Sequence, residues 1–299
     1  MKFTKAISNP LLTYIMAPNI CDVLSEIKRI IKSQHSHYLA LYAIFLLPLN
    51  FFSLIFQLLL KHFQQQQPPP NPTIIISLSL LLIIFSTIFT YGAIISITYS
   101  VFHGFFNRQV KLNEAIKSIS TSFFPLLATN IVMFTVIFFV SFLILFLILL
   151  LSFLTLLLDD VHATLYSYLN SLSYMVLMLS FLSFVTYLAI NFSFVHVIVV
   201  VESCWGFEPL RRSWKLVKGM KWLILTIIFL FGSFPILVSM SGYNNWVLIF
   251  VSSPIVAMFS LYNIAAITVV YIYSKEKHGV VANEGFGKEK DGAHLPLIP

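Results

Sequence analysis

The sequence of 299 residues has few charged side chains: Asp, Glu, Lys and Arg make up 10% of it, against about a quarter in an average soluble protein. So few charges cannot coat a water-soluble fold, which excludes a soluble enzyme and a nucleic-acid-binding domain. The chain has only two cysteines, which excludes a disulfide scaffold. A hydrophobic fraction of 59% and a mean hydropathy of +0.91 exclude an intrinsically disordered chain.

The hydrophobic residues are gathered in six long apolar stretches. About 20 residues at 1.5 Å each cross roughly 30 Å of hydrocarbon, and an open strand would leave backbone groups unpaired in lipid. We therefore predict an all-α, polytopic integral membrane protein with six transmembrane helices. The predicted spans are residues 38–60, 73–102, 123–158, 172–201, 222–240 and 246–273.

Six spans place both termini on one side of the membrane, and the basic residues indicate which side. Every Lys and Arg except Lys61 lies in one of four places. These are segment 1–37, the connection between the second and third spans, the connection between the fourth and fifth spans, and segment 274–299. Because basic residues in short loops are retained in the cytosol, we expect both termini to be cytoplasmic, in the endoplasmic reticulum or the plasma membrane. Segment 1–37 is then a cytoplasmic segment with an amphipathic helix, 38–273 the transmembrane domain, and 274–299 a disordered cytoplasmic tail.

An amphipathic stretch precedes each odd-numbered span, at residues 20–31, 112–119 and 208–219. The apolar residues in each stretch follow a helical spacing, so we expect three cytoplasmic amphipathic surface helices. Each is followed by a span out and a span back, which predicts a unit that occurs three times. Chance patterning of polar connections is the alternative.

The third amphipathic stretch carries the densest positive charge. Its basic residues and a tryptophan are our candidate contacts with anionic lipid or a partner protein: Arg211, Arg212, Lys215, Lys218 and Trp214. The alternative is that these charges only orient the protein in the membrane.

Polar side chains also recur along one helical face of the fourth predicted span, and they are Ser180, Ser183, Tyr187, Asn191 and Glu202. Such a stripe is typical either of a solute path in a small-solute or lipid carrier or of polar packing between helices. We expect Glu202 to lie at the cytoplasmic headgroup level and to pair with Arg211 or Arg212.

The sequence contains no motif for catalysis, for a cofactor or for a metal ion. Asp159 and Asp160 are adjacent, so on a helix they would point about 100° apart, which suits a solvated loop better than a catalytic pair. His196 is the only histidine inside a predicted span, and we expect it to bond within the bundle. We therefore predict a non-enzymatic protein without a cofactor, whose partner is the lipid bilayer, with protein partners unidentified and no nucleic acid.

The most distinctive segment, residues 201–219, reads Val-Glu-Ser-Cys-Trp-Gly-Phe-Glu-Pro-Leu-Arg-Arg-Ser-Trp-Lys-Leu-Val-Lys-Gly. It resembles a motif in a family of six-span hydrophobic plant membrane proteins of unknown function. It is also similar to a loop in the membrane domain of some bacterial glycerophosphodiester phosphodiesterases. In both, a Glu (here Glu202) ends one span, a Gly (Gly206) follows, and a Leu-Arg-Arg-Ser-Trp helix leads into the next span.

The residues 268–271 before Lys275 also resemble the plant family, in which a Cys often stands where this chain has Ser274. The plant resemblance covers most of the chain, whereas the bacterial one is confined to the later spans. The bacterial resemblance implies proximity to lipid, and the soluble catalytic barrel of those enzymes has no counterpart here.

The predicted orientation can be tested by cysteine labelling in a background carrying Cys21→Ser and Cys204→Ser. A Gln65→Cys variant is expected to react with an impermeant maleimide only from the lumenal or outer side, and a Lys288→Cys variant only from the cytosol. Reaction of both positions from the same side would contradict the topology.

Overall fold

The computed structural model describes residues 18–65, 71–157, 163–240 and 246–278, and within these ranges it contains helices and no β-strand. The elements are α2 (Ile20–Ser33), α3 (His35–Leu41), the π-helical turn η1 (Tyr42–Leu46), α4 (Leu47–Gln65), α5 (Pro72–Phe105), α6 (Leu112–Leu157), α7 (Ala163–Asn191), α8 (Val195–Glu202), α9 (Phe207–Leu216), α10 (Lys221–Met240) and α11 (Trp246–Lys277). The predicted all-α class is confirmed.

Six helical segments are long and apolar enough to cross a membrane, as the sequence predicts. They are His35–Phe63, Thr73–Phe105, Leu112–Leu150, Met178–Glu202, Lys221–Val238 and Phe250–Lys277. Six apolar helices fit a multi-pass membrane protein. Two of the predictions fall on residues outside the described ranges: the loop position of Asp159 and Asp160, and most of the predicted disordered tail, 279–299. The beginning of that predicted tail is helical, because α11 continues to Lys277.

The helix boundaries differ from the predicted spans in three places. Segment 112–119 is not a separate surface helix, because it forms the first turns of the 46-residue α6. No Gly separates it from the rest of α6, and the helix continues through Pro125. The fourth apolar stretch contains two helices, α7 and α8, which are separated at residues 192–194. The first span widens into the π turn η1 directly before Pro48, whose missing N–H and ring disturb the preceding turn.

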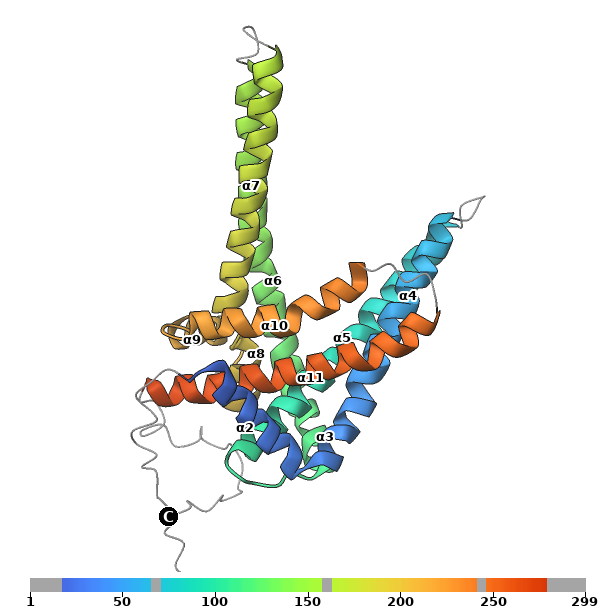
Figure 1. Ribbon diagram of the computed structural model, residues 1–299, viewed down its shortest axis with the longest axis vertical. Coiled ribbons are helices and arrows are strands. Elements are labelled where there is room, and N and C mark those ends of the chain that lie inside the picture. The colour runs from blue at the N-terminus through green and yellow to red at the C-terminus, as the bar shows by residue number, and fades with distance from the viewer. Residues whose placement is uncertain (1–17, 66–70, 158–162, 241–245, 279–299) are drawn as a thin grey trace, which may run out of the picture.

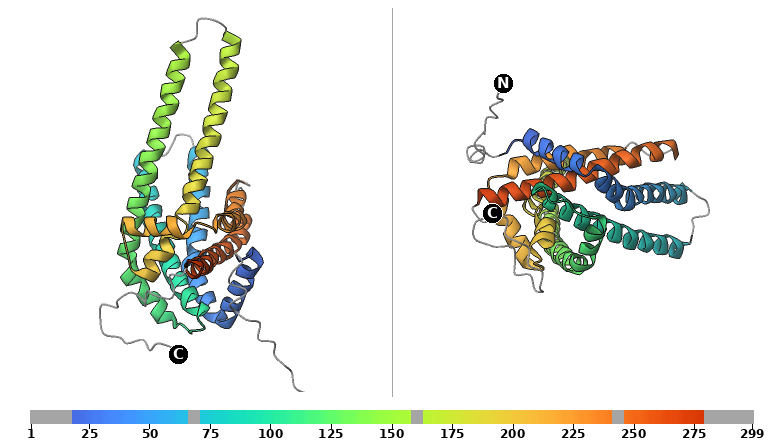
Figure 2. Two further views of the ribbon diagram at one scale, coloured as in Figure 1. Left: turned by 90° about the vertical axis from the view of Figure 1, so that its left-hand side faces the viewer. Right: turned by 90° about the horizontal axis from the view of Figure 1, so that it is seen from below.

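Three helical hairpins diverge from a common base (Figures 1 and 2). Helices α6 and α7 form a tall pair, α4 and α5 lean to one side of it, and α10 and α11 run across it and are seen nearly end-on in the left-hand view of Figure 2. The base holds α2, α3, α8 and α9. The hairpins thus fit the predicted threefold unit, but a separate amphipathic helix precedes only the first and third hairpins.

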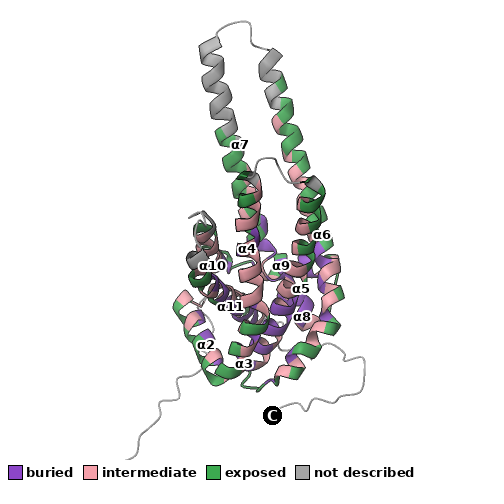
Figure 3. Cartoon of the chain, turned by 90° about the vertical axis from the view of Figure 1, so that its right-hand side faces the viewer, coloured by how far each residue is buried: buried purple, intermediate pink, exposed green. Residues whose placement is uncertain are grey.

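The α6–α7 pair projects beyond the rest of the molecule, and its described outer residues are exposed (Figure 3). Large apolar side chains point outward on both helices, including Phe138, Phe142 and Leu179, with 66%, 60% and 68% of their surface exposed. A surface of this kind requires an apolar surrounding medium.

The base, by contrast, is a closed core. Val23, Ile27 and Ile30 of α2 are fully buried in one cluster with residues of α5, α8 and α11. The apolar face of α2 is therefore covered by protein. The close approach of α2 to α5 depends on Gly104, because a Cβ there would lie 2.9 Å from Cγ2 of Ile30.

Arg29 fixes the polar side of α2 to the end of α5. Its Nη1 donates to Oδ1 of Asn107 at 2.6 Å, and its Nη2 donates to the carbonyl oxygen of Phe105 at 3.2 Å. The cation thus lies at the negative end of the α5 dipole. The Glu26 carboxylate accepts from Nε of Arg29 and raises the pKa of the guanidinium.

Truncation of Ile27 tests whether α2 belongs to the folded core. Ile27→Ala removes a fully buried side chain and is expected to cost about 2–5 kcal/mol through lost burial and a cavity. Ile116→Ala makes the same chemical change at an exposed position and is expected to have little effect. The measurement is the thermal unfolding midpoint of the full chain in detergent; equal midpoints for both variants would contradict this packing.

Candidate functional site

The densest set of polar contacts lies where α8 ends and the chain reverses into α9. Ser203 adopts a left-handed backbone conformation at φ 51°, and Gly206 lies at φ 81°. The Gly206 conformation suits only a residue without a Cβ. Its N–H donates to Oγ1 of Thr129 on α6 at 3.0 Å. This turn is therefore anchored to the neighbouring hairpin.

Helix α9 is held against the protein along one face. Leu210 is buried with Leu188 and Phe192 of the α7 segment. Ser213 is fully buried, and its hydroxyl donates to the carbonyl oxygen of Asn191 at 2.5 Å. That bond satisfies a carbonyl at the end of α7, where intrahelical partners run out. The rotation of α9 about its own axis is thereby fixed.

Glu202 is the centre of this junction. One carboxylate oxygen accepts from Oη of Tyr271 at 2.6 Å and from Nζ of Lys275 at 2.8 Å, while the other accepts from Nη1 of Arg212 at 2.7 Å. Only 11% of the Glu202 side chain is exposed. Buried charges require such partners, so one carboxylate joins α8, α9 and the end of α11.

A second carboxylate extends this ion cluster toward the surface. Oε1 of Glu208 accepts from Nε of Arg212 at 3.0 Å and from Nη2 of Arg211 at 3.2 Å. Hydrogen bonds to Glu208 and Glu202 raise the pKa of Arg212. The bonds from Arg212 and then Arg211 lower the pKa of Glu208, so this pair is complete at neutral pH and is lost only as the pH falls into the acid range.

The structure separates the five predicted lipid-contact residues into two groups. Arg212 turns inward to the two carboxylates, as one of the two pairings predicted for Glu202. Arg211, Lys215 and Lys218 are exposed, and we call these three residues the basic row. Trp214, 38% exposed, lies beside the row with its ring edge-on to Tyr187 at 5.5 Å between centroids.

The five residues of the predicted polar stripe do not share one helix. Ser180, Ser183 and Tyr187 are exposed on α7, and the Ser183 hydroxyl donates to the carbonyl oxygen of Leu179 in its own helix. Asn191 is buried at the end of α7, and Glu202 lies on α8 beyond the break. Nothing in this arrangement favours a path over packing, and the carrier function stays a prediction.

A smaller polar group lies inside the base between α5, α6 and α8. The Asn130 amide donates to the hydroxyl of Tyr91, and its carbonyl oxygen lies 3.4 Å from Nε2 of His196. These contacts agree with the expectation that His196 bonds within the bundle.

In the described part of the chain, the side chains form no recognisable catalytic or metal-binding arrangement. No group of three or more His, Cys, Asp or Glu residues there could hold a metal ion. Burial, followed by the nearby Glu202 charge, raises the pKa of the Cys204 thiol, which disfavours a reactive thiolate. The junction joins charged side chains in ion pairs and fixes the direction of α9.

Tyr271 and Lys275 were not recognised as partners of Glu202 from the sequence. They lie four residues apart and so share one face of α11. That spacing indicates a shared face, but it does not indicate that α11 approaches α8, which is a tertiary contact.

Comparisons with protein-family models, curated proteins and solved structures found no match. The resemblance of segment 201–219 to the plant family therefore stays an expectation.

The role of Glu202 can be measured against that of Glu208. Glu202→Gln leaves Arg212 and Lys275 without their shared buried charge, and we expect it to lower the free energy of unfolding by about 3 kcal/mol. Glu208→Gln is the matched control at a more exposed carboxylate, and a much smaller loss is expected. Thermal unfolding midpoints of the two variants in detergent check this order; the reverse order would contradict it.

Proposed function

We propose that the chain is a non-enzymatic multi-pass membrane protein whose basic row contacts the headgroups of anionic lipids in the cytoplasmic leaflet. The observation that supports the proposal best is the fixed rotation of α9. Its buried side, with Leu210 and Ser213, packs on the protein, so Arg211 and Lys215 are held outward, and Lys218 is exposed in the turn that follows. Arg212, one residue from Arg211, is occupied by carboxylates.

The aromatic residues around the basic row support a position at the membrane interface. Trp205 in the turn before α9 and Trp222 in α10 are 67% and 82% exposed, and Trp214 lies beside the row. Tryptophan is enriched where hydrocarbon meets headgroups. Trp222 also lies at the first turn of α10, where one of the six apolar segments begins.

The size of the expected effect follows from the number of exposed charges in the basic row. Each basic residue near an anionic leaflet contributes about 1 kcal/mol, so three contribute about 3 kcal/mol, or two orders of magnitude in affinity. Arg211 contributes least, because Glu208 partly neutralises it.

The proposal includes the orientation that the charge distribution predicts, with both termini in the cytosol and the protein in the endoplasmic reticulum or plasma membrane. A partner protein with an acidic surface is the competing contact for the same row.

The basic row is tested with the variant Arg211→Gln/Lys215→Gln/Lys218→Gln, which leaves Arg212 on Glu202. Binding of the detergent-solubilised protein to immobilised phosphatidylserine and phosphatidylcholine vesicles is measured at about 0.1 M and about 1 M salt. We expect the variant to lose about 100-fold in affinity for phosphatidylserine at low salt and little at high salt, where charges are screened beyond about 3 Å.

The control removes three positive charges elsewhere, through Lys28→Gln/Lys32→Gln/Lys117→Gln, all at exposed positions. An equal loss in both variants would show that net charge acts instead of the basic row. Unchanged binding of the first variant would reduce the row to an orientation signal or a protein contact.

A further inference from the structure

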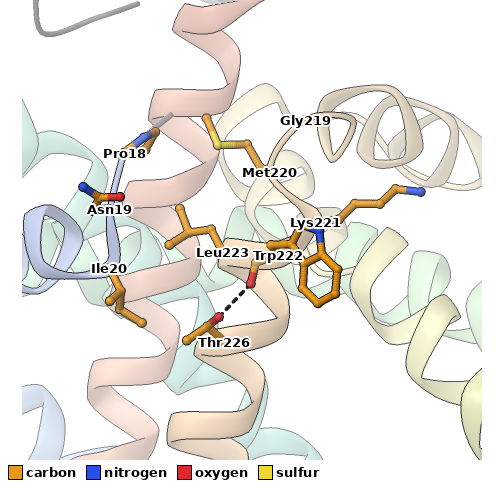
Figure 4. Close-up of a pocket in the computed structure, with 9 residues that line it drawn as sticks. All are labelled: Pro18, Asn19, Ile20, Gly219, Met220, Lys221, Trp222, Leu223 and Thr226. Atoms are coloured by element: carbon orange, nitrogen blue, oxygen red, sulfur yellow. Dashed lines mark hydrogen bonds between the residues drawn. The ribbon is translucent and has the colours of Figure 1, made fainter. Parts of the chain in front are cut away.

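A groove of about 540 Å³ separates the first turn of α2 from the first turn of α10 (Figure 4). Pro18 and Ile20 form one wall, and Met220, Trp222 and Leu223 form the other. Figure 4 shows these two segments facing each other, although two hundred residues separate them in the chain. Most of the lining is apolar, and the volume is in the range of small-molecule sites.

Positive charge lies at one end of this groove. The ammonium of Lys277 lies 3.3 Å from the position that a Cβ would take on Gly219, which lines the groove. Lys221 also lines it, while its ammonium lies over the Tyr187 ring of α7, 5.1 Å from the centroid. Lys218 is exposed in the same turn. On the α2 side, the Asp22 carboxylate accepts from the N–H of Asn19 at 3.1 Å. One ammonium, that of Lys277, therefore lies against the lining at Gly219, and Lys218 and Lys221 belong to the same turn.

Along α10, the residues that line the groove change from charged to aromatic to apolar. A lipid molecule changes in the same order, from its headgroup to its acyl chain. Lys221 begins both α10 and the fifth apolar segment, so it lies at the edge of the apolar layer. Trp222 follows at the level typical of interfacial tryptophan. Leu223 and Thr226 lie further along the helix, and the Thr226 hydroxyl is turned to the carbonyl oxygen of Trp222 at 2.8 Å, as Figure 4 shows.

We propose that this groove binds one anionic glycerophospholipid. Its phosphate lies at the Gly219–Lys221 turn and its acyl chain along Ile20, Leu223 and Thr226. The charge of the turn selects an anionic headgroup, and the apolar walls bind the chain. The inference deepens the proposed function, since it rests on this end of the molecule meeting an anionic leaflet, but it names a separate site, outside the basic row except for the neighbouring Lys218.

The experiment fills the groove and leaves every charge in place. Thr226→Trp places a large side chain at an exposed position of the wall, and Thr226→Val is the matched control that removes only the hydroxyl. The full chain is purified in detergent, incubated with phosphatidylserine or phosphatidylcholine, and examined by native mass spectrometry for retained lipid. We expect one phosphatidylserine on the wild type and on Thr226→Val, and at least about tenfold less on Thr226→Trp.

The charge requirement is tested in the same assay with Lys221→Gln/Lys277→Gln, which is expected to remove the preference for phosphatidylserine over phosphatidylcholine. Ile20→Trp fills the groove from the opposite wall and is expected to reproduce the loss, so that a folding defect of one variant does not decide the outcome. Equal retention of both lipids by the wild type, or full retention by both filled variants, would overturn the proposal.

The two proposals fail in different ways. Thr226→Trp keeps Arg211, Lys215 and Lys218, so its salt-dependent binding to phosphatidylserine vesicles is expected to equal that of the wild type. Loss of the retained lipid with intact vesicle binding supports the groove as a separate site. Intact lipid retention together with unchanged vesicle binding in the basic-row variant would leave the groove standing and overturn the proposed function.

Discussion

The buried carboxylate of Glu202 is the constraint from which the arrangement of the base follows. In a chain with 10% charged residues, it gathers Arg212, Lys275 and the hydroxyl of Tyr271. A carboxylate removed from water is stable only with such partners, so α9 must bring Arg212 inward and α11 must end beside α8. The buried Leu210 and Ser213 lie on the opposite side of α9 from Arg211 and Lys215, which are exposed, as is Lys218 in the turn that follows the helix.

The molecule divides into two regions that satisfy their polar groups differently. In the base, side chains bond across helices, as the buried Ser213 does to Asn191 and the exposed Arg29 to the end of α5. Along the described parts of the α6–α7 pair, hydroxyl groups such as those of Thr135 and Ser183 bond to carbonyl oxygens of their own helices, and the outer surface is apolar. The base behaves as a protein core, and the hairpins present a surface suited to lipid.

The sequence was sufficient for the features that depend on composition and period. The all-α class and six apolar helices follow from apolar length, and the amphipathic character of α2 and α9 follows from helical spacing. The break at residues 192–194 was not predictable, because no Gly or Pro marks it. The groove between α2 and α10 and the contact of Glu202 with Lys275 depend on tertiary packing. Residue spacing in a single sequence does not indicate which helices pack together.

The length of α6 has a consequence for the membrane itself. At 1.5 Å per residue its 46 residues extend about 69 Å, and its exposed apolar side chains, from Phe124 to Phe153, cover about 45 Å of that, whereas the hydrocarbon layer is about 30 Å thick. Each ångström of mismatch costs a fraction of a kcal/mol, and a helix avoids that cost by leaning. A thinner bilayer requires a greater lean than a thicker one. Around the α6–α7 pair, either the helices lean or the bilayer thickens locally.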